Sequence, residues 1–85
     1  MKTYRFHQDS GHGWLAVKRM ELIALGIIHK VSAYSYQRGK TVYLEEDSDA
    51  QLFLDALCNN GMEWLIKHSY TDGRSPIRSY EGFTA

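Results

Sequence analysis

The chain has 85 residues, its ten lysines and arginines are balanced by ten aspartates and glutamates, and 44% of its residues are hydrophobic. A chain of this length and composition forms one small folded domain with a thin core. Zero net charge removes the long-range attraction of a basic protein to polyanions. The single cysteine, Cys58, excludes an internal disulfide and a multi-cysteine zinc site.

The N-terminal residues 1–8 lack the apolar core of a signal peptide. No apolar run approaches the roughly 18 residues that cross a bilayer. We therefore expect a cytoplasmic protein with no membrane contact. Its ordered core should run from about Lys2 to Tyr80, and residues 81–85 should form a tail.

Alternating apolar residues predict a first strand over Tyr4–His7 and a second over Trp14–Val17. The loop between them contains two glycines, which are able to adopt positive φ, so we expect a shaped loop rather than a two-residue turn. A helix over Lys18–Leu25 should follow, with Leu22, Ile23 and Leu25 toward the core. Gly26 then ends that helix.

A second hairpin is predicted from strands at Val31–Gln37 and Lys40–Glu45, joined by a turn at Arg38 and Gly39. In this register Tyr34 faces Tyr43, and Ser35 faces Val42. Val31, Ala33, Val42 and Leu44 would then line the core, whereas Tyr34, Tyr36 and Tyr43 would share the opposite face.

Ser48 and Gln51 match a capping box, which predicts a helix that ends near Asn59–Gly61. A last strand is expected over Met62–His68, followed by a turn over 71–76. The resulting order is β-β-α-β-β-α-β. It predicts an α+β domain with a mainly antiparallel sheet and two short helices packed on one face.

The tyrosine face is the first candidate binding surface, with Arg38 at the tip of its hairpin. Tyrosine and arginine are the residues that dominate interface hot spots. The competing interpretation is that the C-terminal residues 77–83 fold back and cover the tyrosines. The face could also pair with itself in a homodimer or stack nucleic-acid bases, although an RNA-binding sheet would bring more positive charge and its own motif.

Two charged groups are secondary candidates. Arg74 and Arg78 could bind phosphate or carboxylate, or could pair with local acids. The acidic run Glu45, Glu46, Asp47 and Asp49 could dock a basic partner, but acids at a helix N-terminus are already explained by the helix dipole.

His7, Asp9 and His12 are the residues best suited to chemistry, because such types bind metals or transfer protons. They lack an established ligand spacing, and Asp9 could simply cap its turn. No phosphate loop, nucleophile elbow or pair of catalytic carboxylates occurs. The sequence therefore predicts no cofactor and favours a protein that is not an enzyme.

Four stretches resemble blocks of small hypothetical proteins from phages, prophages and plasmids, namely His7–Leu15, Tyr34–Gly39, Val42–Asp47 and Asp72–Arg78. The resemblance implies a mobile element inside a bacterial host, where small proteins often block a host protein, as anti-CRISPR proteins do. It carries no known functional residues.

The hypothesis is a non-enzymatic protein that binds a host protein or itself through the tyrosine hairpin. The alternatives are a metal or nucleotide site on His7, Asp9 and His12, and nucleic-acid binding by the sheet.

Overall fold

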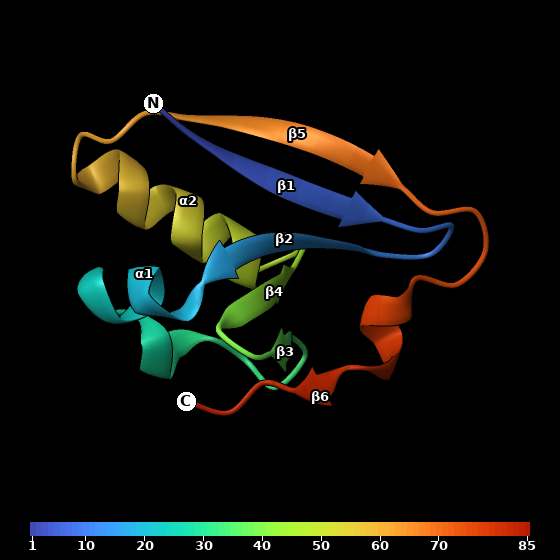
Figure 1. Cartoon of the computed structure of the whole chain (residues 1–85). Helices are drawn as coiled ribbons and strands as arrows, with labels where there is room; N and C mark the ends of the chain where they lie inside the picture. Colours follow the sequence, from blue (N-terminus) through green and yellow to red (C-terminus); the bar gives the residue numbers. More distant parts are fainter.

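The computed structural model describes residues 1–85, which form a six-stranded sheet in the order β5-β1-β2-β4-β3-β6 (Figure 1). Every neighbouring pair is antiparallel except β1 and β5, which are parallel. The α+β class with a mainly antiparallel sheet is therefore confirmed. The strands are β1 (Lys2–Gln8), β2 (Gly13–Lys18), β3 (Tyr36–Arg38), β4 (Thr41–Glu45), β5 (Trp64–Tyr70) and β6 (Glu81–Gly82); the helices are α1 (Arg19–Ala24) and α2 (Asp49–Asn59), with 3-10 turns η1 (Ile28–Lys30) and η2 (Pro76–Ser79).

The main core lies between one face of the sheet and both α-helices. The sheet contributes alternate residues of β2 and β4, and α2 contributes Phe53 and Leu57. The predicted core positions Val42 and Leu44 are fully buried, as expected. In α1 only Leu22 is buried, and Ile23 is 52% exposed, so its predicted core position is wrong.

The short helix α1 ends as the sequence predicts. Gly26 has a φ of 72°, a conformation that glycine adopts without a steric penalty. The Ile27 N–H then donates to the Leu22 carbonyl at 3.0 Å, and Ile27 itself is buried. This is the Schellman arrangement, in which the residue after glycine folds back onto the last turn.

The second hairpin is shorter than predicted and has a different register. Only Tyr36–Arg38 pairs with β4, and Tyr36 lies opposite Tyr43 rather than Thr41. The turn is therefore formed by Gly39 and Lys40, with Gly39 at a φ of 59°. Tyr36 and Tyr43 do share the face opposite the main core, but Tyr34 lies outside the sheet.

A buried carboxylate explains why residues 31–35 leave the sheet. The Asp49 side chain accepts hydrogen bonds from the Ser32 N–H (3.0 Å), the Ser32 hydroxyl (2.7 Å) and the Ser35 hydroxyl (2.6 Å). Serine side chains that bond locally compete with the ladder of a sheet. The segment is therefore held as a turn against the start of α2, and Ala33 and Tyr34 are exposed at its tip.

The C-terminal segment crosses the sheet on the face opposite the α-helices. β5 and β6 lie at opposite edges, and the chain between them runs past the ends of the intervening strands (Figure 1), with Arg78 over Trp14 of β2. The Tyr80 ring packs 5.2 Å from the Tyr43 ring, and Phe83 is 5% exposed within the main core. The tail expected over 81–85 is therefore wrong as far as Phe83, and the fold-back interpretation is confirmed for Tyr43.

Candidate binding site

Asp9 joins the loop between β1 and β2 to the C-terminal segment. Its carboxylate is buried and accepts hydrogen bonds from the N–H groups of Gly11, His12 and Ser75, each at 2.9 Å. The Arg78 guanidinium adds two more, from Nε at 2.6 Å and Nη2 at 2.8 Å. Arg78, followed by the Ser75 N–H, lowers the pKa of Asp9 far below its usual range, and Asp9 raises the pKa of Arg78. Asp9 is thus a fixed anion that orients Arg78.

These contacts argue against Asp9 as a metal ligand or as a group that transfers protons. All five donors to Asp9 belong to the protein itself, so no ligand position is left for a metal. His7 lies on the sheet, 5.8 Å from the Tyr43 ring, where burial and then the Arg5 charge lower its pKa. No group of three or more histidine, cysteine or acidic side chains is placed to hold a metal ion.

Trp14 is the residue of the site that the sequence interpretation missed. It lies on the β2 face opposite the main core, yet only 3% of it is exposed. The Arg78 guanidinium carbon lies 5.7 Å from the centre of one of its rings, and the Tyr36 ring meets it edge-on at 6.1 Å. The sequence did contain an indication of this, because β2 is apolar on both faces, with Trp14 and Ala16 on one face and Leu15 and Val17 on the other. Such a strand is covered on both sides.

Gly11 in the β1–β2 loop and Gly13 at the start of β2 do not adopt positive φ, but a side chain at either position would meet a neighbouring side chain. A Cβ atom on Gly13 would clash with the Phe6 ring. One on Gly11 would lie 2.7 Å from Nη2 of Arg78. Both glycines therefore let the loop lie against the side chains that shape the site.

Glu45 and the start of α2 form the opposite wall. The predicted capping box is wrong, because Ser48 makes no side-chain bond to the first turn of α2. The Glu45 carboxylate instead accepts the N–H groups of Asp47, Ser48 and Asp49 at 2.9, 2.7 and 2.8 Å. Burial alone would raise the pKa of Glu45, but these N–H bonds outweigh it and lower that pKa. Glu45, rather than Ser48, therefore caps the start of α2, and these bonds hold its side chain in one position.

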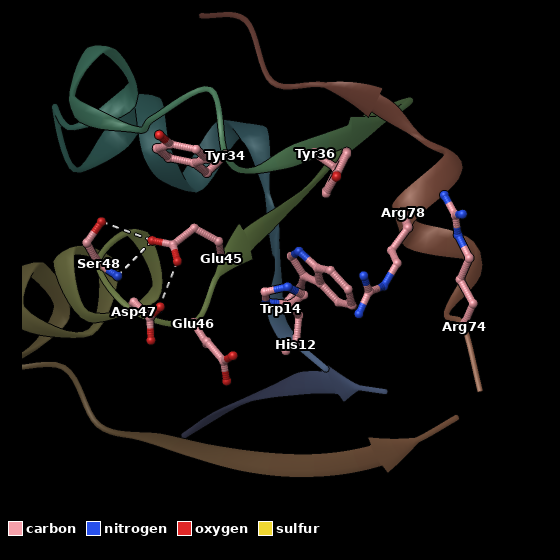
Figure 2. A pocket seen from close by; sticks show the side chains of 11 residues that line it. His12, Trp14, Tyr34, Tyr36, Glu45, Glu46, Asp47, Ser48, Arg74 and Arg78 are labelled. Carbon is pink, nitrogen blue, oxygen red and sulfur yellow. Dashed lines mark hydrogen bonds between the residues drawn. The ribbon is translucent and has the colours of Figure 1, made fainter. Parts of the chain in front are cut away.

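Together these elements surround a cavity of about 570 Å³, here called the central hollow. Figure 2 shows the acidic side chains and Ser48 on one side, Arg74 and Arg78 on the other, and aromatic rings between them. The sequence proposed these groups as three separate candidates, and the fold brings seven of their members into one site. The lining residues are His12, Gly13, Trp14, Tyr34, Tyr36, Glu45, Glu46, Asp47, Ser48, Arg74 and Arg78.

The other candidate residues lie outside the central hollow and make internal contacts. Arg38 donates to the Tyr80 hydroxyl at 3.1 Å and lies over the Tyr80 ring. Tyr43 is half-buried between His7 and Tyr80, and burial, followed by Tyr80, raises its pKa. Asp49 is buried by its serine contacts.

Comparison of the chain with protein-family models, with curated proteins and with solved structures gave no match. Neither α1 nor α2 has the length and apolar character needed to span a bilayer. What the protein does must therefore be inferred from its own residues.

Proposed function

We propose that this is a non-enzymatic binding protein whose central hollow takes up part of a protein partner. The observation that carries the proposal is the convergence, from four separate parts of the chain, of aromatic rings and charged groups of both signs. Cavities of about 300 to 1,000 Å³ are the usual size of ligand sites, and tyrosine, tryptophan and arginine are the side chains that most often anchor an interface.

The supporting geometry is a base whose charged groups are held by internal contacts, with an exposed tyrosine at its rim. Asp9 and Trp14 fix Arg78, and Glu45 is fixed by the start of α2. Tyr34, by contrast, is 82% exposed at the edge of the hollow. A preorganised base reduces the entropy lost on binding, and an exposed tyrosine supplies contact area at low entropic cost.

Charge argues against the nucleic-acid alternative. The central hollow contains three carboxylates and two guanidinium groups, and one of those guanidinium groups is already paired with Asp9. A phosphate backbone would have to approach Glu46 and Asp47, which are exposed acids. Like charges brought together at an interface cost free energy and suppress the wrong partner.

The test compares capture of host proteins by wild type and by Tyr34→Ser. Tyr34 is exposed, so its loss should leave the unfolding midpoint unchanged and reduce capture of a specific partner. Tyr70→Ser is the matched control, because Tyr70 is 63% exposed but lies on β5 and does not line the central hollow. Equal capture by both variants would contradict the proposal.

The resemblance to phage and plasmid proteins makes a bacterial host protein the proposed partner, with a defence system as one target. Quantitative mass spectrometry of the captured proteins identifies it. Light scattering of the isolated protein examines the other proposed partner, a second copy.

A further inference from the structure

The charged groups at the two ends of the central hollow are available to a partner. Neither of the chain's two ion pairs involves Arg74, Glu46 or Asp47. All three side chains are exposed and line the hollow. Single exposed charges are ordinary, but here opposite signs face each other across aromatic rings (Figure 2). The hollow therefore has an acidic end and a basic end, so a bound segment with charges of both signs would have one preferred orientation.

The charge at the arginine end selects the kind of anion. Asp9 already neutralises Arg78, so Arg74 supplies the one uncompensated positive charge. A carboxylate, with one negative charge, matches this end. A phosphate group carries nearly two charges and would be left partly uncompensated. Arg78 can still donate from its remaining N–H groups, since only Nε and Nη2 bond Asp9.

The acidic end selects a cation that is also planar. Glu46 and Asp47 supply free carboxylates, and Tyr34 lies on the same side of the hollow as Glu45 and Ser48 (Figure 2). A guanidinium group can pair with a carboxylate through two N–H bonds while stacking on a tyrosine ring, which an ammonium group cannot do equally well. Arginine is therefore the side chain that fits best.

We propose that the central hollow binds an extended polypeptide segment of its partner, with an arginine between Tyr34 and the carboxylates of Glu46 and Asp47 and an acidic side chain at Arg74. This inference rests on the proposed function and names the chemistry of the partner segment. It also gives that segment an orientation, because the arginine and the acid occupy opposite ends.

The test uses end-capped synthetic peptides in which one arginine and one aspartate are separated by a glycine-serine spacer of increasing length. Each peptide is titrated to millimolar concentration into isotope-labelled protein and followed by NMR at the Trp14 indole N–H. At least one spacer should give saturable shifts there. Replacing its arginine by glutamine or its aspartate by asparagine should weaken binding roughly twofold to fivefold, the range for an exposed charge pair. Absence of shifts with every spacer would overturn the proposal.

A charge exchange then tests the arginine end. The Arg74→Glu variant should bind the arginine-aspartate peptide more weakly than wild type does. It should bind more tightly than wild type a peptide in which lysine replaces the aspartate. Lys67→Glu is the matched control, since it makes the same change in net charge on β5, outside the hollow. Equal effects of the two variants would overturn the inference, because they would show a response to net charge alone. Shifts that depend on protein concentration without peptide would also overturn it, in favour of a second copy.

Failure of this inference and failure of the proposed function give different results. If Tyr34→Ser abolishes partner capture but Arg74→Glu does not, the hollow is a binding site and the charge assignment is wrong. If neither variant changes capture, the proposed function is wrong as well.

Discussion

Replacing Asp49 tests whether one buried carboxylate shapes the segment that carries Tyr34. Asp49→Ala removes the acceptor of three hydrogen bonds, two of them from serine hydroxyls, and leaves those donors near or within the core. Lost bonds to a charged group and unsatisfied buried donors together cost about 2 to 4 kcal/mol. Asp49→Asn keeps one oxygen acceptor and should cost about half as much.

Urea unfolding followed by tryptophan fluorescence measures this change. At an m-value of about 1 to 1.5 kcal/mol/M for a chain of this size, the Asp49→Ala midpoint should fall by about 2 M. Asp47→Ala is the matched control, because Asp47 is two residues away but exposed, and it should change stability by at most about 0.5 kcal/mol. If the two alanine variants were equally stable, Asp49 could not be what holds residues 31–35 out of the sheet.

Three further outcomes follow from the contacts described above. Phe83→Ala should cost about 3 kcal/mol in chemical unfolding, because its ring fills the main core, and a loss below about 0.5 kcal/mol would mean that the C-terminus is not docked. Because the folded-state pKa of Asp9 is lowered, its contribution to stability is present above about pH 4 and is lost as the pH falls further. Asp9→Asn should therefore melt at a lower temperature than wild type at neutral pH, and its melting temperature should fall less on acidification. The same fall in melting temperature between neutral and acidic pH in both proteins would contradict this. Gly13→Ala should cost about 1 to 3 kcal/mol through its clash with Phe6, whereas Gly82→Ala, which meets open space, should be nearly neutral in the same assay.

The sequence was most informative where the signal is local. Alternation placed β1, β2 and β4, the apolar stripe placed α2, and Gly26 marked the end of α1, because each depends on neighbouring residues. The register of the second hairpin failed for the same reason. Local residues allowed a turn at Arg38 and Gly39 as readily as at Gly39 and Lys40, and the strand pattern did not indicate that Ser32 and Ser35 bond Asp49 at the start of α2 instead of joining the sheet.

The site could be predicted only in pieces. Residue types indicated Tyr34, Tyr36 and the two arginines as candidates, and all four line the central hollow, but nothing in their spacing indicated that they meet. Their meeting depends on the Asp9–Arg78 pair, which spans 69 positions, and on a C-terminal segment that crosses from one edge of the sheet to the other. A sequence pattern cannot specify such pairings, because many acids and bases of the chain could in principle have paired.

The most direct test of the central hollow as the binding site begins with a random peptide library displayed on yeast. The library is selected against the wild-type protein without any assumption about charge. Selected peptides are then titrated into isotope-labelled protein. We predict that they shift the Trp14 indole N–H and the amides of residues 34–36, and that Tyr34→Ser weakens them while Tyr70→Ser does not. Peptides that shift only β5 or α1, with the Trp14 signal unmoved, would contradict the account.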